Sequence, residues 1–181
     1  MRQWMNLVET MLPPAAEAET KAETPAVLYH GTGPATAAMI VASGLIIATE
    51  PVDDEHGPCV CTSASRKVAH DFACEYVRMA SPYDVGFIFT LNGTLIAQTC
   101  EVVSYEAETA SSDEQEFRIL DDLTVSRVVT GIQATGDVAL LADRSFLRKV
   151  YDEASGGDEF QRLFPTYQSF SAVLSKMLRH R

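Results

Sequence analysis

The sequence lacks a long apolar run and an excess of basic residues, and each absence argues against a class of protein. No apolar run approaches the roughly 20 residues that cross a bilayer, and the start has no basic region followed by the apolar core of a signal peptide. Lysine and arginine number 14 against 25 aspartate and glutamate residues, which gives a formal net charge of −11. Clusters of cations that would neutralise phosphates are therefore not expected. We predict a cytoplasmic protein with no membrane contact and no general nucleic-acid binding.

Cysteine is scarce, and its four positions, 59, 61, 74 and 100, lack the spacing of metal ligands. We expect the side chains of Cys59 and Cys61 to face opposite ways on a strand and so not to share an ion. Buried free thiols are the preferred interpretation, because free cysteine is among the most buried residue types. No metal site is predicted.

The chain is long and apolar enough for one folded domain, with 181 residues of which 46% are hydrophobic and 22% charged. Residues 1–12 carry apolar side chains at helical spacing, which predicts an amphipathic helix that docks on the domain or contacts an assembly partner. Residues 13–24 are rich in Ala, Glu and Thr and predict a linker. We expect the folded domain at 25–138 and a helical tail that packs on it at 139–181.

Alternating strand and helix patterns from residue 27 onward predict an α+β fold. A helix at 34–43 should stop at Gly44, and a helix at 65–79 should be capped by Ser63 or Ser65. A hairpin is predicted over 85–103, since Asn92-Gly93 suits a tight turn between two apolar runs. Further strands are expected at 27–29, 59–61, 114–120 and 125–132, and further helices near 146–151, 158–164 and 167–179.

Three polar clusters stand at the ends of predicted strands. In Tyr29-His30-Gly31-Thr32, glycine lets the backbone approach a ligand beside an imidazole. Cys61-Thr62-Ser63 closes the next strand, and Glu114-Gln115-Glu116 opens a later one, where both carboxylates can line one cleft. Each cluster alone also has an ordinary explanation, as a core histidine, a helix cap or a charged strand edge.

The order and spacing of these clusters resemble ADP-ribosyltransferases. Leu28-Tyr29-His30-Gly31-Thr32 is similar to the Tyr/Trp-His-Gly-Thr/Ser motif of the diphtheria-toxin-like and poly(ADP-ribose)-polymerase branch. Cys61-Thr62-Ser63 and Glu114-Gln115-Glu116 instead resemble the Ser-Thr-Ser and Glu-x-Glu motifs of the arginine-modifying branch. The resemblance implies a split β-sandwich of two antiparallel sheets with flanking helices and NAD as the substrate between the sheets.

The resemblance also implies a role for each motif residue. His30 would contact the adenosine-side ribose, Gly31 would hold the nicotinamide carboxamide, and Thr32, Cys61, Thr62 and Ser63 would complete the NAD site. Glu116 would stabilise the oxocarbenium-like state and Glu114 would orient the acceptor nucleophile, with His30 and Ser63 as the remaining catalytic residues. We expect Gly31→Val to abolish NAD binding and to leave the fold intact. The second motif lacks an aromatic residue, so Phe72 or Tyr76 would have to stack on nicotinamide.

The implied function is that of a phage- or toxin-like mono-ADP-ribosyltransferase that modifies a protein side chain and releases nicotinamide. The acidic loop 104–113 would recognise the protein acceptor. Two alternatives stay open. One is a non-enzymatic module that keeps the fold, which the missing aromatic residue favours. The other is an enzyme like the RNA 2′-phosphotransferases, which share Leu-Tyr-His-Gly-Thr but need basic residues of which this chain has few.

Overall fold

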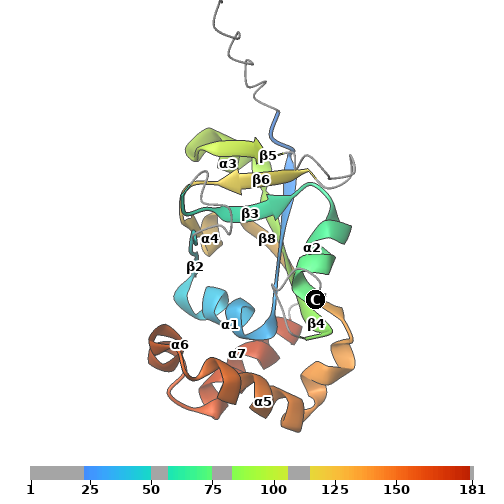
Figure 1. Cartoon of the computed structure of the whole chain (residues 1–181), viewed down its shortest axis with the longest axis vertical. Helices are drawn as coiled ribbons and strands as arrows, with labels where there is room; N and C mark the ends of the chain where they lie inside the picture. The colour runs from blue at the N-terminus through green and yellow to red at the C-terminus, as the bar shows by residue number, and fades with distance from the viewer. Residues whose placement is uncertain (1–22, 50–56, 75–82, 106–114, 180–181) are drawn as a thin grey trace, which may run out of the picture.

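The computed structural model describes residues 23–49, 57–74, 83–105 and 115–179. The predictions for residues 1–12, for Glu114 and Tyr76, and for most of the linker and of the acidic loop lie outside these ranges. The described elements are strands interspersed with helices, followed by a helical C-terminal part (Figure 1). The predicted α+β class is therefore confirmed. Among the described residues, no helix has both the length and the apolar character needed to cross a membrane.

The strands of the described residues form a large and a small antiparallel sheet. The large sheet has the order β5-β6-β3-β1-β4-β8, and the small one joins β2 and β7. The bounds are β1 (Val27–Thr32), β2 (Leu45–Ile46), β3 (Val60–Ser63), β4 (Val85–Asn92), β5 (Val102–Tyr105), β6 (Glu116–Ile119), β7 (Leu123–Thr124) and β8 (Val129–Gly136).

The large sheet consists of two halves that meet at a single residue pair. In one half, β1 pairs with β4 over its whole length, and β4 pairs with β8. In the other half, β6 pairs with both β3 and β5. Between the halves, β1 and β3 pair only at Tyr29 and Ser63. The ribbons of β3, β5 and β6 run across the direction of β1 (Figure 1). Both halves therefore belong to one sheet and are linked by this pair, and the expected split sandwich of two sheets stays a prediction.

The helices cover the large sheet and form the C-terminal part. Their bounds are α1 (Pro34–Ser43), α2 (Arg66–Cys74), α3 (Gly93–Thr99), α4 (Val125–Val128), the 3-10 helix η2 (Val138–Ala142), α5 (Arg144–Ala154), α6 (Asp158–Leu163) and α7 (Tyr167–Arg179). The predicted stop of α1 is confirmed, because Gly44 has a φ of 76° and its N–H donates to the Ile40 carbonyl. Ser65 Oγ accepts from the Val68 N–H at the start of α2, as one of the two predicted caps.

The predicted hairpin over residues 85–103 is wrong. Asn92 begins a helix, because its side-chain oxygen accepts from the Leu95 N–H at 3.0 Å and caps α3. The strand that follows α3 is β5, and it pairs with β6 rather than with β4. The predicted strand at 125–132 also starts late, because α4 precedes β8.

One apolar core joins the sheet to the C-terminal helices. It includes Leu28 of β1 and Phe89 of β4 together with Val150 of α5 and Phe170 of α7, all fully buried. Helix α7 packs against α1, which follows β1 directly. The strand that carries His30 and Gly31 is thus fixed by the sheet on one side and by α1 at its end.

Candidate functional site

His30 lies on β1 next to the residue pair where the two halves of the sheet meet. Its Nδ1 donates to the Cys61 carbonyl at 2.9 Å, because a carbonyl oxygen can only accept. Burial lowers the pKa of the ring below its ordinary value, although the bond to Cys61 opposes this effect. The imidazole is therefore neutral at pH 7, and its Nε2 carries a lone pair that can accept a hydrogen bond.

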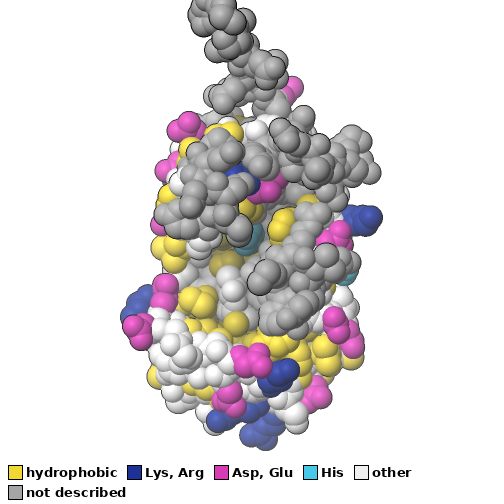
Figure 2. Space-filling view, in the orientation of Figure 1, with side chains coloured by type: hydrophobic (Ala, Val, Ile, Leu, Met, Phe, Trp, Pro, Cys, Tyr) yellow, Lys and Arg dark blue, Asp and Glu magenta, His cyan; other side chains and the backbone are white. Residues whose placement is uncertain are grey.

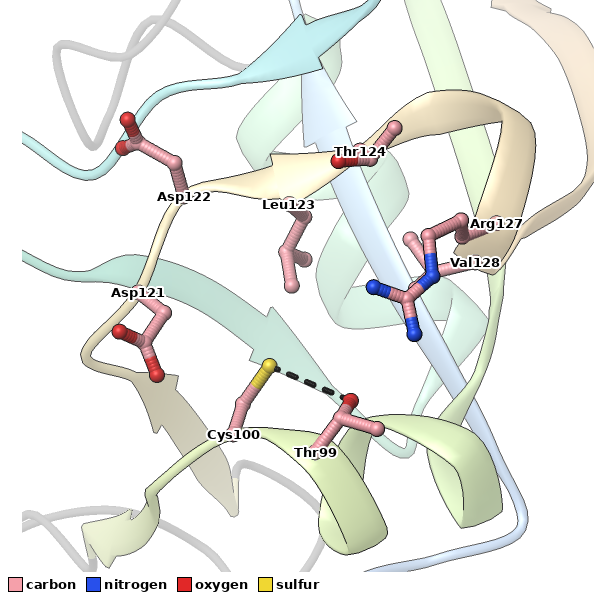
Figure 3. A pocket seen from close by; sticks show the side chains of 8 residues that line it. All are labelled: Thr99, Cys100, Asp121, Asp122, Leu123, Thr124, Arg127 and Val128. Atoms are coloured by element: carbon pink, nitrogen blue, oxygen red, sulfur yellow. Dashed lines mark hydrogen bonds between the residues drawn. The ribbon is translucent and has the colours of Figure 1, made fainter.

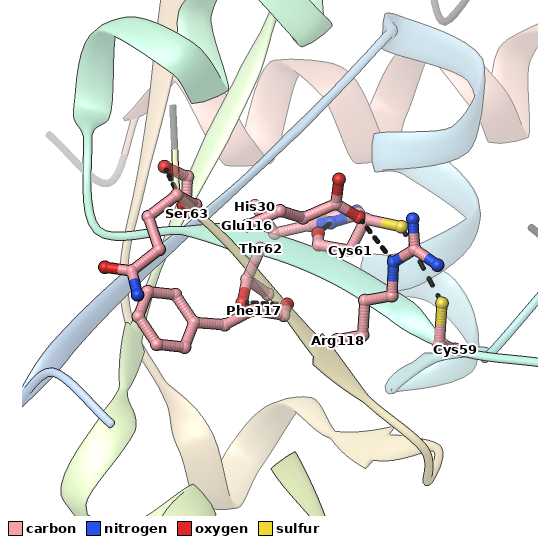
Figure 4. Close-up of polar contacts among 9 residues, drawn as sticks. His30, Cys59, Cys61, Thr62, Ser63, Glu116, Phe117 and Arg118 are labelled. Atoms are coloured by element: carbon pink, nitrogen blue, oxygen red, sulfur yellow. Dashed lines mark hydrogen bonds and ion pairs between the residues drawn. The ribbon is translucent and has the colours of Figure 1, made fainter. Parts of the chain in front are cut away.

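Glu116 opens β6 and is paired with an arginine on the same strand. The Arg118 Nε donates to Glu116 Oε1 at 3.1 Å, and the two side chains are 5% and 22% exposed respectively. In the register of β3 and β6, Glu116 lies opposite Ser63, and Arg118 lies opposite Cys61. Since residues i and i+2 of a strand share a face, all four lie on one face of this half of the sheet (Figure 4).

Cys61 lies near both His30 and Glu116. Its backbone carbonyl accepts from His30 Nδ1, and the Glu116 carboxylate is close enough to its thiol to raise the thiol pKa. Burial raises the pKa of the Cys61 thiol, and the Glu116 carboxylate and Cys59 raise it further. The thiol is therefore protonated at neutral pH. It is therefore not a thiolate nucleophile.

The expectation that Cys59 and Cys61 face opposite ways is wrong. Their sulfur atoms lie 3.8 Å apart, because residues two positions apart in extended chain share a face. Both cysteines are free thiols. Within the described ranges, no three His, Cys, Asp or Glu side chains form a group that could hold a metal ion.

The hydroxyls of the second motif have partners within the fold. Thr62 Oγ1 donates to the Phe117 carbonyl at 2.7 Å, and Ser63 Oγ donates to the Gln115 carbonyl at 3.2 Å. Ser63 Oγ also accepts from the Ser65 N–H at 3.0 Å. These bonds fasten β3 to β6 and to the start of α2. The predicted roles of Thr62 and Ser63 toward NAD stay predictions.

Gly31 is required by the packing of α2. A Cβ at this position would lie 1.7 Å from the Ala69 carbonyl oxygen, which is backbone of that helix. The expectation that Gly31→Val leaves the fold intact is therefore wrong, since α2 would have to move off the sheet. Thr32, which follows, is buried.

The structure brings His30, Cys61, Glu116 and Arg118 together (Figure 4). Ser63 lies two residues beyond Cys61 on β3. The space-filling view shows a hollow on this face in which a histidine surface is exposed near adjoining acidic and basic surfaces (Figure 2). Sequence reasoning missed Arg118. A charged residue inside the apolar run Phe117-Arg118-Ile119 was the signal that could have identified it.

A second pocket, of about 230 Å³, shares no residue with this group (Figure 3). It lies between the end of α3, β7 and α4, and Arg127, Asp121 and Asp122 supply its charges. Asp122 already accepts from the Ala48 N–H at 2.7 Å. Histidine is absent from its lining, so this pocket has no neutral imidazole acceptor like that of His30.

Comparisons of this chain with protein-family models, with curated proteins and with solved structures give no match.

Proposed function

We propose that this protein is an NAD-dependent mono-ADP-ribosyltransferase that transfers ADP-ribose to a side chain of a protein acceptor. One observation carries the proposal. His30 and Glu116 come from distant parts of the chain, and both meet β3, the strand of the second motif. His30 bonds the Cys61 carbonyl, and Glu116 pairs with Ser63. The three motifs that the resemblance assigns to a single NAD site thus converge on one strand, where the halves of the sheet are joined. An ADP-ribosyltransferase-like split sandwich is the finer fold that we propose on the same basis.

The chemistry requires an anion beside the ribose. When nicotinamide leaves, positive charge develops on the ribose, and a fixed carboxylate next to it stabilises the transition state. Glu116 suits this role because Arg118 occupies Oε1 and the side chain keeps 22% of its surface exposed. The remaining oxygen can accept from a ribose hydroxyl. Neutral His30 can accept from a hydroxyl of the other ribose through Nε2.

The nicotinamide end would lie along β1 and α2. As the resemblance implies, the backbone of Gly31 would hold the carboxamide, with Thr32 beside it, on the side of β1 that α2 does not cover. Phe72 on α2 is half-buried and is the described aromatic that we propose to stack on the nicotinamide ring. NAD is a substrate in this scheme and is consumed. Glu114 would orient the nucleophile of the acceptor.

A non-enzymatic NAD-binding module is the second candidate. The ion pair between Glu116 and Arg118 favours it, because a guanidinium 3.1 Å from the carboxylate partly cancels the negative charge that catalysis would use. Such a module would bind NAD without releasing nicotinamide. Turnover therefore separates the two candidates.

The test uses labelled NAD with the full chain and three variants. Wild type should release nicotinamide and label a protein acceptor from a lysate. Glu116→Gln should lower both activities by about two orders of magnitude, or about 3 kcal/mol, the scale for removing one electrostatic stabiliser. Glu114→Gln should spare hydrolysis and reduce transfer. Glu101→Gln, at an exposed position, is the matched control and should be unchanged.

Three outcomes distinguish the candidates. Loss of nicotinamide release in Glu116→Gln, with release kept in Glu114→Gln and Glu101→Gln, supports the transferase. NAD binding by wild type without nicotinamide release supports the module. Absence of both binding and turnover would contradict both.

A further inference from the structure

Arg118 is a buried cation that none of the three motifs accounts for. It is the only Lys or Arg side chain among the buried residues of the described ranges, and its side chain is 5% exposed. Removing a charge from water is costly, and a buried ion pair often contributes no net stability relative to an apolar pair of similar size. A purely structural need for arginine at this position is therefore weak, and the geometry around it points to another reason.

The contacts of Glu116 show what the arginine does. Arg118 Nε donates to one carboxylate oxygen at 3.1 Å. On the neighbouring strand, Cys61 lies opposite Arg118 and Ser63 lies opposite Glu116 in the register of β3 and β6. A carboxylate held by a donor from its own strand and flanked by a paired strand has less freedom to rotate. The guanidinium is itself fixed by burial, so the carboxylate is oriented before any ligand arrives.

We infer that Arg118 is a positioning residue, which holds the Glu116 carboxylate so that one oxygen faces the bound ribose. This inference rests on the proposed function. Arg118 acts through Glu116 and need not touch NAD. A carboxylate that drifts by about 1 Å from its productive position can lose about a hundredfold in rate, so such a residue affects turnover more than binding. Lysine could supply the charge at this position, but not the planar fork that fixes direction.

The experiment is a double-mutant cycle on nicotinamide release, with kcat, KM for NAD and thermal unfolding measured for each variant. Arg118→Gln should lower kcat by about tenfold to a hundredfold and change the KM for NAD by less than about threefold. Arg118→Lys should recover part of the loss. In the Glu116→Gln background, Arg118→Gln should have little further effect, because the carboxylate it orients is gone. Arg127→Gln, at an exposed position, is the matched arginine control.

Each outcome decides the inference. If wild type turns over NAD and folded Arg118→Gln keeps the wild-type kcat, Arg118 has no positioning role and the proposed function stands. Arg118→Gln could also lower kcat in the Glu116→Gln background by the same factor as in wild type. That result would show that Arg118 acts independently of Glu116, which also overturns the inference. If Arg118→Gln does not fold, Arg118→Lys decides in its place, and a wild-type kcat in that variant overturns it. Wild type without turnover would end both proposals.

Discussion

His30 donates its Nδ1 proton to a backbone carbonyl and lies where burial disfavours a charged ring. Its pKa in the folded protein is therefore below the ordinary value of 6.5, which the unfolded chain retains. As the pH falls through 6.5, the unfolded state binds the proton first, so stability is lost on acidification. The loss continues down to the folded pKa and then levels off.

Replacement of His30 by glutamine should remove this pH-dependent term. We expect the Tm of wild type to fall more steeply than that of His30→Gln between pH 7.5 and pH 5, because the variant has no imidazole to protonate. Thermal unfolding of both proteins in the same buffers measures the difference, and the carboxylates that titrate near the acid end are common to both. Parallel curves would mean that desolvation does not lower the pKa of His30 in the folded protein.

The sequence predicted His30 and Glu116 but not their partners. Both residues were identified from the order of the motifs. His30 directly follows an apolar run, and Glu116 directly precedes one. Arg118 bonds Glu116 within β6, and the register of β3 and β6 brings Cys61 opposite Arg118 and Ser63 opposite Glu116. Register follows from which residues face the core across the whole sheet, and a single segment does not contain that information.

At the scale of elements, helix signals were predicted more accurately than pairing. Helix α7 runs from Tyr167 to Arg179 as predicted, because its apolar periodicity and the preceding Pro165 are local features. The apolar run 85–91 was also recognised. Its continuation was not, because Asn-Gly suits a tight turn and Asn suits a helix cap equally well. Only the pairing of β5 with β6 distinguishes the two.

The packing of α2 on β1 depends on Gly31, and Gly31→Ala tests it. The added Cβ would meet the Ala69 carbonyl oxygen at 1.7 Å, and that atom is backbone and cannot swing away. We expect a loss of about 1–3 kcal/mol or more, the range for overpacking a tight contact. Urea denaturation followed by circular dichroism measures it as a lower midpoint.

Gly156→Ala is the matched control for this substitution. No atom lies within 4 Å of the position its Cβ would take, so its midpoint should stay within about 0.5 kcal/mol of wild type. Equal urea midpoints for Gly31→Ala and Gly156→Ala would mean that α2 does not pack closely against Gly31. In that case the close approach of helix and strand beside the proposed nicotinamide site would also be in doubt.

For the whole molecule, one core spans the predicted boundary between the domain at 25–138 and the helical tail at 139–181. Helices α5, α6 and α7 contribute an aromatic cluster in which the ring of Phe170 lies within 6 Å of those of Tyr151, Phe160 and Phe164. Phe170 belongs to the same apolar core as Phe89 of β4. Helix α7 also packs on α1, which leads directly from the His30 strand. The C-terminal helices therefore support the strand that carries the first motif.

Phe170→Ala should consequently unfold the sheet and the helices together. Truncating a fully buried phenylalanine costs about 3–5 kcal/mol, which is a large part of the stability of a domain. Hydrogen exchange should show the amides of β4 and of α7 losing protection by the same free energy, because one core holds both. Gln168→Ala, at an exposed position of the same helix, should leave both unchanged. If only the α7 amides lost protection, the C-terminal helices would be a separate unit that opens alone. The His30 strand would then keep its position without them.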